Sequence, residues 1–251
     1  MKLHHAFIVC LVILLTLPAA AFGREVTLAS VDWKPYAARD LPNFGFTAEI
    51  IAAALDRAGH TARFEFYPWK RAMMVVRHGE TDALFSAYPS DERARTYAVS
   101  EPYAHSPLVL CAMKGNDIGY TTLRDLAPYR LGVVSGYVNT PEFDAADYLK
   151  KEPVTSDQLN LKKLVRGRLD AVLIDKYVAI HLLKNDPAVE ADLSVVYFIS
   201  PPLAIRPLHV MFSRAVPDHE AILDDFNRGL KAIEADGTVN EILKRYGFLN
   251  P

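Results

Sequence analysis

Two side chains of opposite charge stand where two short apolar segments end. Residues 82–85 (DALF) lead through a polar stretch to Arg93, and residues 171–174 (AVLI) lead directly to Asp175. Each segment is bounded by turn signals, which predicts a strand, the first one buried in a parallel sheet. In open α/β sheets, ligands bind in the crevice outside the carboxyl ends of the strands. The pair therefore predicts a site with a guanidinium on one side and a carboxylate on the other.

The composition is that of a globular chain. Its 251 residues are 51% hydrophobic and 23% charged, with a formal net charge of −2. This length has room for one large or two small domains with sizeable cores. No basic block interrupts the sequence, which argues against nucleic acid as a partner.

Residues 1–23 have the pattern of a secretory signal peptide. Lys2 precedes an apolar core over residues 6–17, and small residues before residue 24 provide the cleavage site. The apolar core is too short to span a bilayer, and no later stretch approaches ~20 apolar residues. The mature chain is therefore predicted to be exported, periplasmic and soluble. Cys10 leaves with the signal, so Cys111 is alone and no intramolecular disulfide is expected.

The first part of the chain alternates predicted strands and helices, which is typical of a parallel sheet. An amphipathic helix is predicted over residues 47–58, and Pro68 suits the first turn of a second helix. The predicted strands of this part are residues 25–31, 63–66, 82–85 and 107–113.

The remaining residues predict a second unit and a return of the chain to the first. Predicted helices cover residues 122–126, 141–151, 157–165, 177–184, 218–234 and 238–246. Predicted strands cover residues 129–134, 171–175, 193–199 and 208–213. This order predicts an α/β fold of two lobes with a cleft between them. The first lobe would comprise residues 24–113 and 203–251, and the second residues 114–202.

With these elements in place, the sequence resembles the family 3 extracellular solute-binding proteins over nearly all of the mature chain. The matching motifs are Gly45-Phe46, Gly79-x-x-Asp82-Ala83, Ser90-Asp91-Glu92-Arg93, Ser100-Glu101-Pro102-Tyr103, Gly167-x-x-Asp170-Ala171 and Gly237-Thr238 to Tyr246-Gly247. Their order and spacing together are specific. The resemblance implies a bilobed, periplasmic-binding-protein-like fold of type II, and a receptor that delivers a polar amino acid to an ABC importer.

The same resemblance assigns roles to two charged residues. Arg93 matches the arginine that binds the ligand's α-carboxylate, because a planar guanidinium holds a carboxylate through two parallel hydrogen bonds. Asp175 matches the acid that receives the α-ammonium group. Both residues also have a structural interpretation. Arg93 could pair with Asp91 or Glu92 at the surface, and Asp175 could cap the helix that begins near Tyr177.

Aromatic and hydroxyl side chains complete the predicted site. Trp33 and Trp69 match the aromatics that sandwich the ligand, where a cation–π contact would favour a cationic group. Ser86 and Ser90 match residues that complete the first-lobe side of the site. Tyr88, between them, is also predicted to contact the ligand. Both tryptophans could instead be ordinary core residues.

One turn departs from the family pattern. Where the family has a small run such as Gly-Thr-Thr, residues 135–139 read SGYVN, with bulky Tyr137 and β-branched Val138. Tyr137 is predicted to lie near the mouth of the cleft. Arg71 is a further candidate that could equally be solvated or paired. The chain is therefore interpreted as a divergent relative in the polar amino-acid-binding group.

No motif indicates a metal site, a cofactor or a hydrolytic active site. The histidines are scattered, and the sequence lacks a Gly-x-Ser-x-Gly elbow, a P-loop and a dinucleotide-binding fingerprint. The leading prediction is a monomeric, non-enzymatic periplasmic protein that binds a small, amino-acid-like carboxylate for a membrane ABC permease. Two alternatives stay open: a dehydratase-like enzyme on the same fold with Asp175 as general acid, and a ligand sensor without transport.

Overall fold

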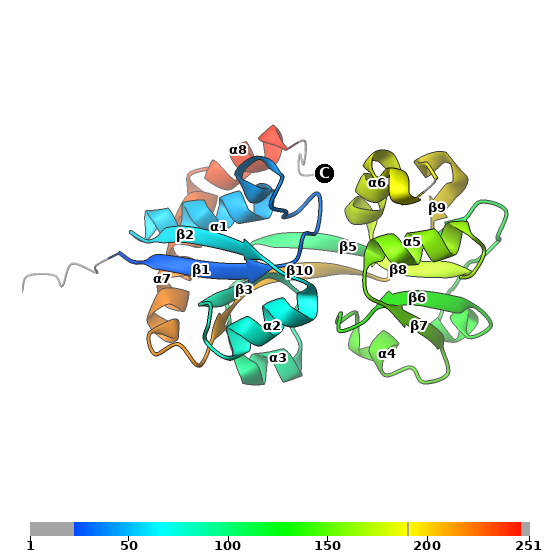
Figure 1. Cartoon of the computed structure of the whole chain (residues 1–251), viewed down its shortest axis with the longest axis horizontal. Helices are drawn as coiled ribbons and strands as arrows, with labels where there is room; N and C mark the ends of the chain where they lie inside the picture. The colour runs from blue at the N-terminus through cyan, green and yellow to red at the C-terminus, as the bar shows by residue number, and fades with distance from the viewer. Residues whose placement is uncertain (1–22, 190, 247–251) are drawn as a thin grey trace, which may run out of the picture.

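The computed structural model describes residues 23–189 and 191–246. Figure 1 shows an elongated molecule with two groups of helices and strands, which we call the first lobe and the second lobe. The predicted signal peptide lies, except for Gly23, outside the described residues. Within those residues no helix has the length and apolar character needed to cross a membrane.

The first lobe contains the N-terminal elements and the C-terminal helices. Its elements are β1 (Glu25–Ser30), the 3₁₀ turn Pro42–Phe44, α1 (Phe46–Arg57), β2 (Thr61–Phe66), α2 (Trp69–Arg77), β3 (Ala83–Ala87), α3 (Asp91–Thr96), β4 (Tyr97–Val99), α7 (His219–Ala235) and α8 (Thr238–Arg245). Helices cover both faces of its sheet in Figure 1.

The second lobe is built from the middle of the chain. Its elements are the 3₁₀ turn Leu123–Leu126, β6 (Arg130–Val134), α4 (Pro141–Asp144), β7 (Lys150–Val154), α5 (Asp157–Val165), β8 (Ala171–Asp175), α6 (Lys176–Asn185), the 3₁₀ turns Pro187–Val189 and Leu193–Val195, and β9 (Val196–Phe198). The residue limits of the lobes stay a prediction, but the two groups of elements are distinct in Figure 1.

Two long strands, β5 (Ala104–Met113) and β10 (Ala204–Ser213), run between the lobes. They pair with each other in antiparallel fashion over residues 104–108 and 204–208. The other half of β10 pairs with β3 and β4, and the other half of β5 pairs with β8 and β9. One antiparallel ladder therefore connects two otherwise separate sheets, and the strand order is β2-β1-β3-β10-β5-β8-β6-β7.

Parallel pairing within each lobe places several strand ends at the boundary between the lobes. β1 pairs in parallel with β2 and β3, and β6 pairs in parallel with β7 and β8. This arrangement confirms the predicted α/β fold with two lobes. The strand-end rule then directs attention to the residues that follow β1, β3, β6 and β7.

Most predicted elements agree with the structure within a few residues, but one helix prediction is wrong. The sequence predicts a helix over residues 141–151, whereas α4 ends at Asp144 and residues 150–154 form β7. The N-cap Thr140 and Pro141 start this helix as expected. The strand is hard to recognise because Lys150–Val154 has a Lys-Lys-Glu start and a proline, which conceal an outer strand of the sheet.

The first lobe is held together by the contact of α1 with α7. Ile50, Ile51, Ala54 and Leu55 are fully buried along one face of α1, which is the apolar stripe expected from the sequence. Gly229 of α7 allows the close approach, because a Cβ at this position would lie 1.9 Å from the backbone oxygen of Ala54.

Replacing Gly229 by alanine should therefore destabilise the protein, although Gly→Ala inside a helix normally stabilises it by roughly 0.5–1 kcal/mol. The clash is with backbone, so α7 must move away from α1 at a cost of about 1–3 kcal/mol. Urea unfolding monitored by circular dichroism measures this change. Gly119→Ala is the matched control, since a methyl group added there would meet no described atom within 4 Å. Equal midpoints for the two variants would contradict the tight packing.

Candidate ligand-binding site

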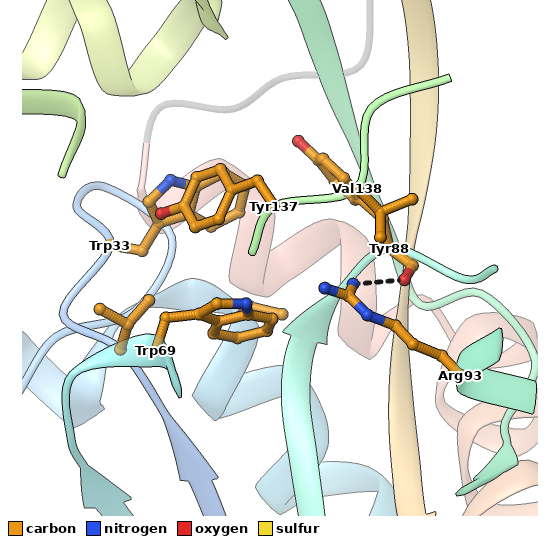
Figure 2. Close-up of a pocket in the computed structure, with 8 residues that line it drawn as sticks. Trp33, Trp69, Tyr88, Arg93, Tyr137 and Val138 are labelled. Atoms are coloured by element: carbon orange, nitrogen blue, oxygen red, sulfur yellow. Dashed lines mark hydrogen bonds between the residues drawn. The ribbon is translucent and has the colours of Figure 1, made fainter. Parts of the chain in front are cut away.

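A cavity at the boundary between the lobes contains ≈ 290 Å³ of space outside the protein atoms, which includes open solvent. Residues of both lobes line it: Val31, Trp33, Trp69, Ser86, Tyr88, Arg93, Tyr137 and Val138. Figure 2 shows the aromatic rings and the Arg93 guanidinium around this space. Half of the lining residues are thus aromatic, and one of the others is a cation.

Arg93 is buried at the start of α3, with 7% of its surface exposed. Its Nη1 donates to the carbonyl oxygen of Tyr88 at 2.7 Å, and its Nη2 donates to that of Gly136 at 3.1 Å. Burial lowers the pKa of this guanidinium to about 10, so it remains charged at neutral pH. It forms no ion pair with a carboxylate among the described residues, in contrast to the surface pairing considered from the sequence.

The turn after β6 brings the second lobe to this guanidinium. Gly136 has φ +81°, a left-handed conformation that glycine adopts without steric cost. Its carbonyl oxygen accepts from both Arg93 Nη2 and Trp69 Nε1, the latter at 3.2 Å. The Asp144 side chain holds the turn through hydrogen bonds from the backbone and side-chain nitrogens of Asn139. One peptide group of the second lobe therefore binds two side chains of the first.

The aromatic residues of the two lobes meet across the cavity. Trp69 begins α2, and the Arg93 guanidinium lies 5.3 Å from its ring centre. The rings of Trp69 and Tyr137 pack edge to face at 6.1 Å. Trp33 stacks on Tyr36 at 4.4 Å, which fixes its position after β1. The predicted aromatic residues are thus brought together around the cavity, and both tryptophans are buried as well.

The end of β3 and the residues that follow it shape the first-lobe wall. Ser86 has φ +56°, an unusual conformation for a residue other than glycine, and its backbone N–H donates to Tyr103 Oη at 3.0 Å. Ser90 does not line the cavity. It caps α3, because its hydroxyl accepts from the backbone N–H of Arg93 at 3.2 Å. Ser90 therefore positions the arginine, whereas Ser86 and Tyr88 face the cavity directly.

Asp175 lies behind the cavity wall rather than in it. One carboxylate oxygen accepts from Tyr36 Oη at 2.8 Å and from Ser106 Oγ at 2.5 Å, while the other accepts from the backbone N–H of Val178 at 2.8 Å. The last bond caps α6, as the structural interpretation of the sequence anticipated. Ser106 also hydrogen-bonds to the Tyr88 hydroxyl. Burial raises the pKa of Asp175 to about 6.

A second buried acid, Asp157, is not identified by the sequence analysis. It is the first residue of α5, which follows β7, and 7% of its surface is exposed. Tyr137 Oη donates to its Oδ2 at 3.3 Å. Burial, together with the nearby charge of Asp175, raises the pKa of Asp157 to about 7. Its position obeys the strand-end rule, but the wrong helix prediction over residues 141–151 conceals strand β7.

The remaining sequence predictions have different outcomes in the structure. Arg71 is exposed, and its guanidinium lies over the Tyr67 ring at 5.3 Å, so it does not line the cavity. Val31 and Val138 do line it and were not predicted as contacts. Among residues 23–189 and 191–246, no group of three or more acids, histidines or cysteines is placed to hold a metal ion.

The fold and cavity define the class of bilobed periplasmic-binding-type proteins, and comparison with known proteins agrees. The family model of the bacterial extracellular solute-binding proteins, family 3, matches residues 27–249, so the chain belongs to this family. Its members are binding proteins, which agrees with the prediction of a non-enzymatic function. They act outside the cytoplasm, as the family name states.

The similar proteins are distant in sequence. The chain is 24% identical to a "Probable histidine-binding protein" of Neisseria gonorrhoeae, over 91% of this chain and 85% of that protein. It is 26% identical to the ABC transporter arginine-binding protein 1 of Escherichia coli (strain K12), over 79% of each. The structure of an ancestral arginine-binding protein bound to arginine matches with a TM-score of 0.73 at 21% identity, covering 88% of this chain and 97% of that one.

Asp157→Asn should stabilise the ligand-free protein at pH 8 but have little effect at pH 4. The pKa of this carboxyl is about 7 in the folded protein and about 3.9 in the unfolded chain. Between these two pH values the folded protein therefore keeps a proton that the unfolded chain has released. The cost of the buried charge is therefore absent below pH 4, grows as the pH rises, and is complete above pH 7. Each kcal/mol of this cost that the substitution removes should raise the Tm by roughly 2–4 °C, which calorimetry measures.

The groups that face Asp157 are Asp175, Tyr137, Tyr88 and Trp33, and none of them supplies a cation. Asp147→Asn, at an exposed position of the same lobe, is the control for the loss of one negative charge. A Tm for Asp157→Asn that equals that of the wild type at pH 8 would mean that water reaches this carboxylate, which would contradict the buried position.

Proposed function

We propose that this protein captures an L-α-amino acid in the cavity between its lobes and presents it to an ABC-type importer from the periplasm. The ligand carboxylate binds Arg93 of the first lobe, and the ammonium group is directed to the acidic side of the second lobe, where Asp175 lies. The protein acts as a monomer, with lobes comprising residues 24–113 with 203–251 and residues 114–202. The ladder of β5 and β10 acts as the hinge.

The buried guanidinium of Arg93 is the observation that carries this proposal. A cation is costly to remove from water unless an anion accompanies it, and here its partners are two neutral carbonyl oxygens, besides the Met73 sulfur at 3.9 Å from Nη2. A guanidinium offers five N–H donors in one plane, so donors remain for a carboxylate after these two bonds. A ligand carboxylate is the partner that this geometry lacks.

The Gly136 carbonyl supports a role in closure. This carbonyl oxygen accepts hydrogen bonds from Arg93 Nη2 and Trp69 Nε1 of the opposite lobe. A ligand carboxylate that reaches Arg93 must therefore replace the Gly136 carbonyl or bind beside it. The charged hydrogen bond to a carboxylate is stronger than the one to a carbonyl. Binding would therefore exchange a direct contact between the lobes for one that passes through the ligand, and closure would depend on the ligand.

The relatives support an amino acid as the ligand. The two curated relatives described above are named for binding histidine and arginine, and the second is named as a component of an ABC transporter. Both are distant, so the particular amino acid must follow from the residues of this chain. Arg93 and the aromatic residues supply the part of the site that any amino acid could use.

Arg93→Ala should abolish amino-acid binding by the mature chain, residues 24–251. Removal of one partner of a buried charge pair costs roughly 2–5 kcal/mol, so the Kd should rise at least ~30-fold. Isothermal titration calorimetry with the twenty standard amino acids identifies the ligand in the wild type and measures the loss. Arg93→Lys should recover only part of the affinity, because an ammonium cannot bind both carboxylate oxygens in a fork.

Arg95→Ala is the matched control for this experiment. Arg95 lies two residues further along α3 and is exposed, so its loss removes the same charge without touching the cavity. It should bind the ligand as the wild type does. If Arg93→Ala retained wild-type affinity while folded, the carboxylate site would be elsewhere and the proposed function would lose its basis.

A further inference from the structure

The charges buried around the cavity do not balance. Arg93 supplies one positive charge in the wall, whereas Asp157 and Asp175 stand behind the wall on the second-lobe side. Among the described residues, neither acid pairs with a lysine or an arginine, and the charge of Asp175 raises the energy of ionised Asp157. With both acids ionised, Arg93, Asp157 and Asp175 together therefore carry one net negative charge.

The carboxylates of Asp175 and Asp157 differ in the number of hydrogen bonds that they accept from the protein. Asp175 accepts hydrogen bonds from Tyr36, Ser106 and Val178, so both of its oxygens have protein partners. Among the described residues, Asp157 accepts only the 3.3 Å bond from Tyr137 Oη to Oδ2, and its Oδ1 accepts none. This Oδ1 is not among the fully enclosed atoms, so one oxygen of a carboxylate that is nine-tenths buried stays open to a donor that the protein does not supply.

A second unpartnered group lies at the same place. Trp33 Nε1 is buried and makes no hydrogen bond with the described residues, although Trp33 lines the cavity. The indole N–H is near enough to Asp157 to lower the pKa of this carboxyl, but it does not form a hydrogen bond of normal geometry. In Figure 2 the Trp33 nitrogen and the Tyr137 hydroxyl lie on the same side of the cavity, away from Arg93. Trp33, Tyr137 and Asp157 therefore form an incomplete polar site opposite the guanidinium.

We propose that Asp157 is a specificity-determining residue that selects a cationic amino acid, one with a side-chain positive charge in addition to its α-ammonium group. This inference rests on the proposed function and adds the substrate class. The ligand's carboxylate neutralises Arg93, its α-ammonium group compensates Asp175, and its second cation compensates Asp157. A ligand of net charge +1 then leaves the closed site neutral, whereas a zwitterionic ligand leaves one buried carboxylate uncompensated.

The walls near Asp157 also suit a cation. Trp33, Tyr88 and Tyr137 present aromatic rings, whose faces attract a cationic group that has lost its water. A planar guanidinium can lie against a ring and donate to a carboxylate at its edge, which makes arginine a good candidate. Arg206 adds a further positive charge near Tyr88, at 5.4 Å from that ring, but it is only partly buried and does not line the cavity. Its Nη2 donates to the Pro89 carbonyl oxygen, and its Nε is buried without a hydrogen-bond partner among the described residues, so this charge is held outside the cavity lining.

Two pairs of ligands that differ in side-chain charge test this inference directly. Calorimetric titration of the mature wild-type chain at pH 8 would compare L-arginine with L-citrulline and L-lysine with L-norleucine. At least one cationic member should bind 10-fold or more tightly than its neutral counterpart. In Asp157→Asn the affinity for that cationic ligand should fall at least 10-fold, while the affinity for the neutral counterpart should stay within about 2-fold. Asp147→Asn should behave as the wild type.

The outcomes separate this inference from the proposed function. If the wild type binds a neutral amino acid as tightly as the cationic ones, with dependence on Arg93, the proposed function stands and the role of Asp157 is refuted. If no standard amino acid binds, both fall. The comparison of ligand pairs on the wild type needs no variant, so a lack of preference for the cationic members would overturn the inference even if Asp157→Asn does not fold. An unchanged arginine affinity in a folded Asp157→Asn protein would also overturn the inference.

Discussion

A guanidinium enclosed between two lobes is the constraint on which the rest of this structure depends. Arg93 is removed from water yet bound to the neutral carbonyl oxygens of Tyr88 and Gly136. The N-cap Ser90, the strand β3 and the left-handed Gly136 all serve to place these groups. Because the two carbonyls belong to different lobes, the guanidinium links the lobes directly, and under the proposed function a ligand that binds the cation would alter this link.

Two carboxylates of the second lobe, Asp157 and Asp175, are buried near the cavity without lining it. Tyr36 of the first lobe donates to Asp175, and Tyr137 of the second lobe donates to Asp157, so each acid is hydrogen-bonded to a tyrosine hydroxyl. Burial raises the pKa values of both acids, to about 6 and about 7, so ionisation of the pair is costly in the folded protein. Such a cost is expected of a binding site, which gives up stability that the ligand restores.

The sequence was sufficient for the architecture because apolar periodicity and turn signals determine most elements. Arg93, Trp33, Trp69 and Tyr137 could be placed near one another because strand ends and the family motifs agree. Asp157 could not, since recognition of β7 requires its pairing with β6, a long-range contact that Lys150–Val154 does not reveal by composition. The hydroxyl partners of Asp175 were hidden for the same reason, because Tyr36 and Ser106 approach it only in the folded chain.

A crystal structure of the mature chain with L-arginine tests the central claim most directly, because it locates both ends of the ligand. The account predicts that the α-carboxylate lies against Arg93, where it replaces or displaces the Gly136 carbonyl, and that the guanidinium of the ligand reaches Asp157 beside Trp33 and Tyr137. A bound ligand that leaves Arg93 and Gly136 in contact, or whose carboxylate lies away from Arg93, would contradict the account.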